Sequence, residues 1–214
     1  MKCRYTFIFL MMILFLCSCA TVPRVQERQA QIVLLEQELE RWSNFRLTGM
    51  SDIQYLAFSH RGQFVMARAG NRIRFDILGS GLFGLGGALV SAYANEHELQ
   101  YRLPGNTSIS TRVLENEERA FFDILTGNLT ERIFSQIDNI IETGKCVIEG
   151  FEITFTHLMQ IKEISNPYQE IAVIFNYDRQ DRLTEIRVSV PIIRNLVISV
   201  DKIEHDNIVV SALR

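Results

Sequence analysis

The sequence predicts an α+β fold: one strongly curved antiparallel sheet of about 10 or 11 strands, with helices covering its concave, apolar face. Strand-like runs follow one another along most of the chain without helices between them, which favours antiparallel pairing. Most of these runs carry apolar residues on one face only. The helical period appears in two regions, so helices are expected on one side of the sheet rather than alternating with its strands.

The first expected element is a helix over residues 25–42. Its apolar residues recur at spacings of three and four and form one stripe, made of Ile32, Leu35, Leu39 and Trp42. Such a stripe is typical of a helix that packs on a sheet. The polar positions of this helix are Arg28, Gln31, Glu36, Glu38, Glu40 and Arg41.

The period then changes to two. Ile73, Phe75 and Ile77 alternate with charged residues, and Leu99 and Tyr101 alternate with polar residues on a later strand. Because side chains of a strand point to opposite faces in turn, each set is expected on the apolar face of the sheet. The other expected strands are 46–58 and 62–69, joined at Arg61-Gly62, and 107–113, 147–156, 169–177, 183–190, 194–201 and 206–212.

Helix is expected again between about residues 116 and 142. Gly127-Asn128 interrupts it, and a stripe of Ile133, Ile137 and Ile140 marks its second piece. Upstream, Pro104-Gly105-Asn106 is a turn signal.

The N-terminus has the layout of a secretory signal. Lys2 and Arg4 precede an apolar run from Phe7 to Leu16, which is too short to span a bilayer. Cys19 then stands where a bacterial lipobox carries its acylated cysteine. Residues 1–18 are therefore expected to be a lipoprotein signal peptide, and Cys19 to be lipidated and to hold the mature chain on a membrane. The alternatives are a plain secreted protein and an uncleaved N-terminal anchor.

The length of 214 residues suits one domain, expected at 25–214 after a tether at 19–24. The formal net charge of −3 and the absence of a concentrated basic patch argue against a nucleic-acid partner,. Cys146 is the single cysteine of this domain, so it is either buried or free to pair with another chain. Its place just before a strand favours burial.

An uncharged, glycine-rich stretch runs from Leu78 to Ala94. Its glycines oppose regular structure, so Leu82, Phe83 and Leu85 are expected to form an exposed apolar loop that enters lipid. A buried hairpin tip is the alternative. Residues 79–84 also match the G-x-G-x-x-G dinucleotide pattern, but that motif requires a parallel βαβ unit, and the flanking strands look antiparallel.

No group of residues predicts catalysis or metal binding. The four histidines are scattered and none has a partner at metal-ligand spacing,. Ser80 lacks the G-x-S-x-G pattern of a nucleophile elbow. We therefore expect no enzyme activity, no metal and no cofactor.

The order of features resembles the family of the outer-membrane lipoprotein receptor LolB. The residues that carry this resemblance are Cys19, Arg46-Leu47-Thr48-Gly49, Arg74 to Gly79, Leu103-Pro104-Gly105 and Ile124-Leu125-Thr126-Gly127. The resemblance implies a single LolA/LolB-like domain folded as an unclosed β-barrel, lined with apolar residues and lidded by helices. It implies a cavity for acyl chains, with Ile73, Phe75, Ile77, Leu99 and Tyr101 in its lining.

The resemblance also implies a partner and a place. A soluble periplasmic LolA-like carrier would deliver lipoproteins, and the loop of Leu82, Phe83 and Leu85 would help to insert them. Ala20 follows the lipidated Cys19, and the inner-membrane retention signal, Asp at that position, is absent. We therefore expect a monomeric lipoprotein on the periplasmic face of the outer membrane. The alternative is a structural or assembly lipoprotein that binds a protein partner of the cell envelope without transferring cargo.

Overall fold

The computed structural model describes residues 24–55, 58–79, 88–103, 105, 108–125, 130–190 and 195–213. Its helices are α2 (Arg24–Arg41), α3 (Asn116–Leu125), α4 (Thr130–Phe134) and α5 (Ile137–Thr143). Its strands are β1 (Asn44–Tyr55), β2 (Phe58–Ala69), β3 (Arg72–Leu78), β4 (Ala88–Ala94), β5 (Glu98–Arg102), β6 (Ser110–Val113), β7 (Lys145–Ile148), β8 (Phe151–Phe155), β9 (Ile161–Asn166), β10 (Ile171–Tyr177), β11 (Leu183–Ser189) and β12 (Asn195–Glu204).

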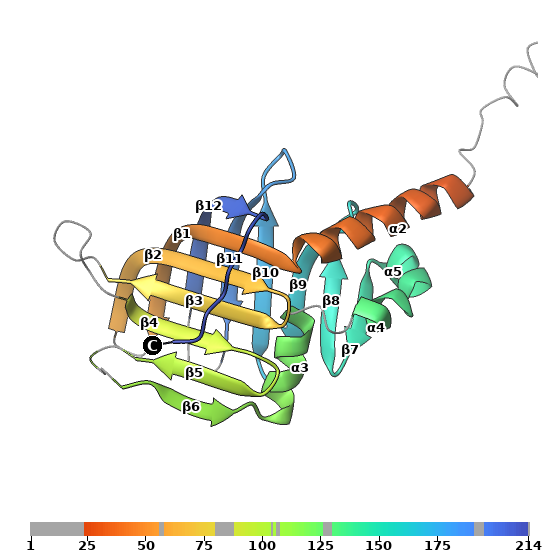
Figure 1. Cartoon of the computed structure of the whole chain (residues 1–214). Coiled ribbons are helices and arrows are strands. Elements are labelled where there is room, and N and C mark those ends of the chain that lie inside the picture. Colours follow the sequence, from red (N-terminus) through yellow and green to blue (C-terminus); the bar gives the residue numbers. More distant parts are fainter. Residues whose placement is uncertain are drawn as a thin grey trace, which may run out of the picture.

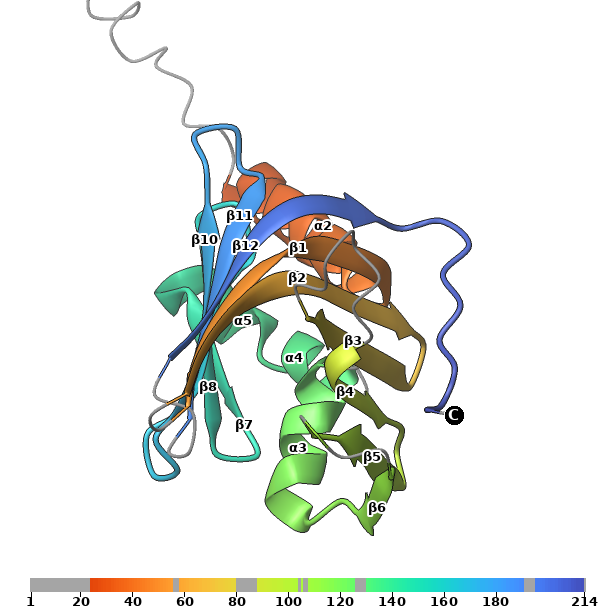
Figure 2. The ribbon, with the colours of Figure 1, turned by 90° about the vertical axis from the view of Figure 1, so that its left-hand side faces the viewer.

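All twelve strands belong to one antiparallel sheet, in the order β6-β5-β4-β3-β2-β1-β12-β11-β10-β9-β8-β7. The sheet curls strongly, yet its edge strands β6 and β7 do not pair with each other in the described structure (Figures 1 and 2). The α+β class and the unclosed antiparallel sheet are confirmed, with slightly more strands than expected.

The helices pack on the concave side. Leu35 of α2, Ile133 of α4 and Ile140 of α5 are buried in the main core, together with apolar strand residues such as Leu47 and Ile153. Figure 2 shows α3 and α4 in the hollow between the two halves of the curved sheet. The stripe expected on the first helix is confirmed, because Leu39 and Trp42 pack against the same core as Leu35.

Strand β3 shows the expected alternation. Phe75 and Ile77 belong to the main core, whereas Arg74 and Asp76 pair with each other on the opposite face, with Arg74 Nε 2.9 Å from Asp76 Oδ2. Ser91 of the neighbouring strand β4 donates a hydrogen bond of 2.6 Å to the same carboxylate. The polar partners of this pair therefore lie on the convex face.

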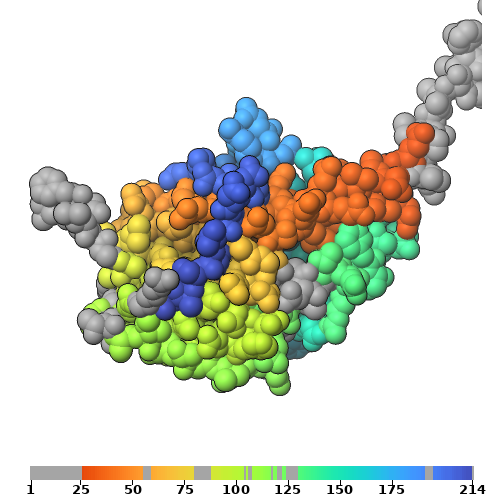
Figure 3. All heavy atoms as spheres, in the orientation of Figure 1, coloured from red at the N-terminus to blue at the C-terminus, as the bar shows by residue number. Residues whose placement is uncertain are grey.

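The expected strand at 206–212 is wrong. This segment has no regular secondary structure and runs across the convex face of the sheet (Figures 1 and 3). Both neighbours of β12 are already strands, β1 and β11, so the chain beyond it finds no free sheet edge there. It packs instead through Val210 and Leu213 against Tyr93.

The single strand expected at 147–156 is a hairpin, β7–β8. Glu149 and Gly150 form its turn with φ angles of 52° and 82°, and two successive positive φ values are typical of a tight hairpin turn. Arg61-Gly62 is not a turn, because both residues lie inside β2. A Cβ atom at Gly62 would lie 2.3 Å from the Leu78 carbonyl oxygen, so glycine permits a close strand approach there. Strands β4 and β9 were not expected.

Gly49 shows the same close approach. It lies at a register shift between β1 and β12, and a Cβ atom there would lie 2.0 Å from the Ser199 carbonyl oxygen. Cys146 is buried as expected, with 0% of its surface exposed, and burial raises the pKa of its thiol to about 12. No helix in the described ranges is long and apolar enough to cross a membrane.

Candidate functional site

An apolar pocket of about 270 Å³ lies on the concave side of the sheet. Seven strands and the residue after α2 supply its lining, which is Trp42, Phe45, Phe64, Met66, Ile73, Phe75, Ile161, Ile164, Val173, Phe175, Ile186, Val188, Val190, Leu196 and Ile198. About half of these side chains are buried and the rest are half-exposed. The pocket therefore reaches solvent, and its wall offers an acyl chain apolar contacts almost everywhere.

Trp42 forms one wall of this pocket. Its ring meets Phe45 edge-on at a centroid distance of 5.0 Å and Phe175 at 5.4 Å, an arrangement that aromatic pairs favour. Its indole Nε1 points to the other side and donates a hydrogen bond of 2.8 Å to Glu38 Oε1. The ring is thus apolar on one side and hydrogen-bonded on the other.

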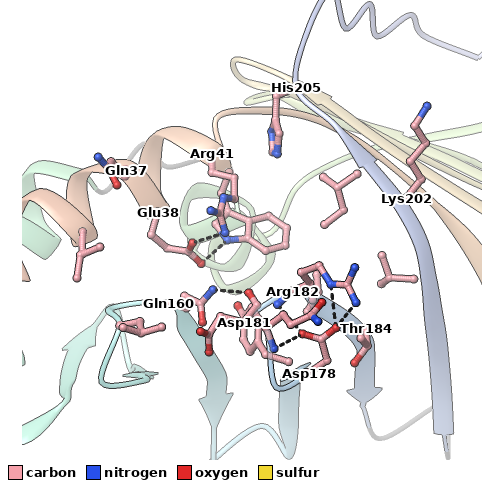
Figure 4. Close-up of a pocket in the computed structure, with 18 of the residues that line it drawn as sticks. Gln37, Glu38, Arg41, Gln160, Asp178, Asp181, Arg182, Thr184, Lys202 and His205 are labelled. Carbon is pink, nitrogen blue, oxygen red and sulfur yellow. Dashed lines mark hydrogen bonds and ion pairs between the residues drawn. The ribbon is translucent and has the colours of Figure 1, made fainter.

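A second, polar pocket of about 810 Å³ lies on the Glu38 side of Trp42 (Figure 4). It is lined by the end of α2, the β10–β11 hairpin and the end of β12. Its polar lining residues are Gln37, Glu38, Arg41, Gln160, Tyr177, Asp178, Gln180, Asp181, Arg182, Thr184, Asp201, Lys202 and His205. Acidic and basic side chains are both present, and Trp42 lines this pocket as well as the apolar one.

Glu38 is the buried centre of this polar region, with only 3% of its surface exposed. Besides the indole of Trp42, it accepts a hydrogen bond of 3.1 Å from the backbone N–H of Ile161 and a long one of 3.4 Å from Arg41. The Tyr177 hydroxyl donates 2.7 Å to the carbonyl of the same Ile161. Burial, followed by the negative charge of Glu38, raises the pKa of Tyr177 above its ordinary value.

The β10–β11 hairpin forms the wall of the polar pocket opposite α2. Arg182 donates to Asp178 Oδ2 from Nη2 at 2.7 Å and from Nε at 2.9 Å, and this hydrogen bonding lowers the pKa of Asp178. The side-chain amide of Gln160 donates 2.9 Å to the backbone carbonyl of Asp181, as the dashed lines in Figure 4 show. These contacts fix the shape of the hairpin beside the pocket.

Arg68 binds the backbone of Trp42, whereas Glu38 binds its indole N–H. It is 2% exposed and donates hydrogen bonds to the backbone carbonyls of Trp42 and Gly70. Burial lowers the pKa of Arg68 to about 10. The junction between α2 and β1 is therefore held from both sides, by Glu38 at the indole and by Arg68 at the backbone.

Neither pocket contains a recognisable catalytic group of residues. In the described ranges no three His, Cys, Asp or Glu side chains are grouped so that they could hold a metal ion. The apolar pocket has no titratable side chain in its lining. The arrangement suits binding of an apolar or amphipathic molecule.

The residues expected to line a cavity are only partly brought together. Ile73 and Phe75 line the apolar pocket, whereas Ile77 is buried in the core beside it. Leu99 packs in a separate cluster with Phe122 of α3. Tyr101 lies half-buried on β5, a strand that supplies no lining residue to this pocket. Cys19 and the loop residues Leu82, Phe83 and Leu85 lie outside the described residues.

Most of the lining was not predicted. Phe45, Phe64, Val173, Phe175 and Ile198 come from strands whose apolar positions could be recognised by their period, but the pairing order that brings them together could not. Glu38, one of the polar positions of the first helix, is buried, because the start of β9 packs over it and supplies the N–H of Ile161. The one available signal was a lone Trp at the end of a helix, four residues after a carboxylate.

No family model and no curated protein matches this sequence. Among solved structures, the chain is similar to a LolA superfamily protein from Nitrosomonas europaea, with 10% identity and a TM-score of 0.43 over 83% of this chain and 94% of that one. It is also similar to a DUF1329 family protein from Desulfovibrio piger, with 12% identity and a TM-score of 0.37 over 87% of this chain and 95% of that one.

Proposed function

We propose that this chain is a lipoprotein of the outer membrane that binds acyl chains of lipoproteins or lipids in the apolar pocket and helps to insert them into that membrane. The observation that carries the proposal is the pocket itself: apolar side chains from seven strands surround a space that reaches solvent. A sheet that served only as a scaffold would fill this space with its own side chains, because protein interiors are normally close-packed.

Burial of apolar surface supplies the affinity. Each CH₂ group that leaves water contributes about 0.8 kcal/mol, so burial of about ten of them supplies the roughly 8 kcal/mol of micromolar binding without a nucleotide or a metal. The half-exposed lining residues, such as Met66 and Leu196, leave a path for entry and exit. A bilayer offers the same chain an apolar environment, so it can act as the acceptor on release.

The anchor and the location are part of the proposal. Cys19 follows a short apolar signal and is proposed to carry the lipid, and Ala20 in the next position suits export to the outer membrane. Leu82, Phe83 and Leu85 belong to the connection between β3 and β4 and are proposed to touch the bilayer. A soluble periplasmic carrier is the proposed donor of cargo.

Acyl binding is tested with the purified, delipidated protein and a brominated fatty acid. Trp42 is the only tryptophan of the chain and lines the pocket, so bromine on a bound chain should quench its fluorescence at saturable, micromolar concentrations. Val173→Phe places a larger side chain in the pocket and should weaken this binding at least tenfold. Val147→Phe, at a position that is 54% exposed on β7, is the matched control and should bind as wild type does. Absence of saturable quenching in the wild-type protein would refute the proposal.

The anchor and the loop need separate tests. Cys19→Ala should abolish metabolic labelling with palmitate and release the protein from membranes. Phe83→Glu should leave the melting temperature nearly unchanged and reduce delivery of a lipoprotein from its soluble carrier to liposomes. If Phe83→Glu instead lowers stability as a core substitution would, by about 3–5 kcal/mol, the residue is packed inside and the proposed loop is wrong.

A further inference from the structure

We propose that the polar pocket beside Trp42 holds a zwitterionic head group, one phosphate with one amine, of a single-chain phospholipid whose acyl chain occupies the apolar pocket. This inference rests on the proposed function and specifies the ligand class of the same site. It is carried by how the two pockets meet, by the charges on the polar side and by the size of the apolar side.

The two pockets share one wall. Trp42 lines both of them, with its ring against Phe45 and Phe175 on the apolar side and its Nε1 hydrogen-bonded to Glu38 on the polar side. Ile161 joins them a second time: its side chain lines the apolar pocket, while its backbone N–H and carbonyl bind Glu38 and Tyr177 of the polar pocket. The two pockets therefore adjoin at Trp42, so an amphiphile bound in both would change from an apolar to a polar environment within the width of one side chain.

The polar pocket offers both signs of charge. Its acidic lining residues are Glu38, Asp178, Asp181 and Asp201, and its basic ones are Arg41, Arg182 and Lys202. Glu38 and Asp178 are already engaged by Trp42 and Arg182, and Lys202 is ion-paired with Glu204. The Asp181 carboxylate forms no hydrogen bond or ion pair with the described residues, and the Arg41 side chain is 48% exposed with only the long contact to Glu38.

These groups match a head group with two opposite charges. Arg41 can receive a phosphate, the anion that basic side chains bind most readily. Lys202 can join it by exchanging its ion pair with Glu204 for the phosphate. Asp181 can receive an ammonium group. A purely anionic head would leave Asp181 facing a negative charge, and an uncharged head would use neither set of partners.

The volumes favour one acyl chain. The apolar pocket of about 270 Å³ lies below the range of about 300–1,000 Å³ of pockets that hold whole drug-sized ligands,, and this small volume favours one chain over two side by side. The polar pocket, at about 810 Å³, is large enough for a head group with its water.

The test uses the purified, delipidated full chain and three ligands that share one brominated acyl chain and differ in their heads: lysophosphatidylethanolamine, lysophosphatidylglycerol and monoacylglycerol. Quenching of Trp42 gives each dissociation constant. The zwitterionic ligand should bind about threefold to tenfold more tightly than the other two, as expected for one or two partly exposed charge contacts. Bromine near the head should quench more strongly than bromine near the chain end, because the junction of head and chain passes Trp42.

Two charge variants test the phosphate contact and the amine contact separately. Lys202→Gln should weaken both phosphate-containing ligands and leave monoacylglycerol unchanged. Asp181→Asn should weaken only the zwitterionic ligand, and asparagine tolerates the positive φ of 58° at this position,. The matched controls are Lys162→Gln and Asp52→Asn, at exposed positions outside both pockets, which should change none of the constants.

The outcomes separate this inference from the proposed function. Saturable quenching with equal affinity for all three heads, or an Asp181→Asn variant that behaves as Asp52→Asn does, would overturn the head-group site and leave acyl binding intact. Tightest binding of monoacylglycerol would also overturn it, in favour of an uncharged, lipoprotein-like head. Absence of quenching by every ligand would overturn both proposals.

Discussion

Replacing Glu38 with alanine should lower the free energy of unfolding by about 2–4 kcal/mol. Glu38 lies near the end of α2 and is almost completely buried. Its carboxylate accepts hydrogen bonds from two N–H groups in different parts of the chain, the indole of Trp42 at 2.8 Å and the backbone of Ile161 at 3.1 Å. The substitution removes the acceptor and leaves both donors behind.

The magnitude follows from these contacts. A hydrogen bond to a charged group contributes about 1.5–3 kcal/mol, so two of them give about 3–6 kcal/mol. Water from the adjoining polar pocket can replace part of each bond, which reduces the expected loss. The contact to Arg41 adds little, because it is 3.4 Å long and the arginine is half-exposed,. Glu38→Gln keeps one carbonyl acceptor and should lose roughly half as much.

Urea unfolding followed by circular dichroism measures the loss. Glu36→Ala is the matched control, since Glu36 is exposed on the same helix, and it should stay within about 0.5 kcal/mol of wild type. The emission of Trp42 in the folded Glu38→Ala protein should also change, because its indole loses a charged partner. If Glu38→Ala is as stable as Glu36→Ala, the buried carboxylate does not hold the α2–β1 junction and the reasoning fails.

Three further predictions concern the sheet and its core. Gly49→Ala should destabilise the fold by several kcal/mol, or shift the β1–β12 register, because its Cβ would lie 2.0 Å from a backbone oxygen. Gly70→Ala is the control: it has open space around it and should cost no more than about 1–2 kcal/mol of backbone strain, measured by denaturant unfolding. Ile77→Asp should cost about 3–5 kcal/mol, since it puts a carboxylate among buried apolar residues,, and a wild-type melting temperature would contradict the orientation of β3. The Cys146 thiol has a raised pKa in the folded protein, so its contribution to stability is complete below its unfolded pKa and is lost as the pH rises from about 9 towards 12. The wild type should therefore lose more stability than Cys146→Ala between a pH of about 8 and a pH of about 10.5. Equal losses would show that the thiol is not desolvated.

The elements that could be predicted from the sequence are those whose local period decides their environment. The helix stripe through Leu35 and the alternation of β3 are of this kind, because spacing alone determines which side chains share a face. Both are found where expected. Burial of Cys146 could be predicted as well, since a small apolar side chain at the start of a strand usually faces the core.

The elements that were missed depend on competition between distant parts of the chain. The segment after β12 has strand-like alternation, yet β1 and β11 already occupy both sides of that strand, so the segment packs by side chains alone. The β7–β8 turn places Glu149 at positive φ, which a glutamate rarely adopts. Only the following Gly150 signals the turn in the sequence.

The candidate site was the least predictable part. Its central contact joins Trp42 to Phe175, which lie far apart in the sequence. Trp42 precedes β1, and Phe175 lies on β10, which is not a neighbour of β1 in the sheet. Their meeting depends on the curvature of the sheet. Glu38 lies three residues after Leu35 and four before Trp42, so it shares the helix face of the apolar stripe,. The packing of β9 against α2 buries its carboxylate there.

Two charged side chains are buried at the junction between α2 and β1, and their contacts indicate a role for this junction beyond stability. Glu38 and Arg68 are both almost fully buried and both bind Trp42, at its indole and at its carbonyl. Buried charges contribute less to stability than well-packed apolar residues of similar size, so stability alone would favour an apolar corner. The two charged side chains instead fix the position and the tilt of the indole ring of Trp42. Because that ring lines both the apolar and the polar pocket, its orientation is expected to control binding of the proposed acyl chain and head group on its two sides.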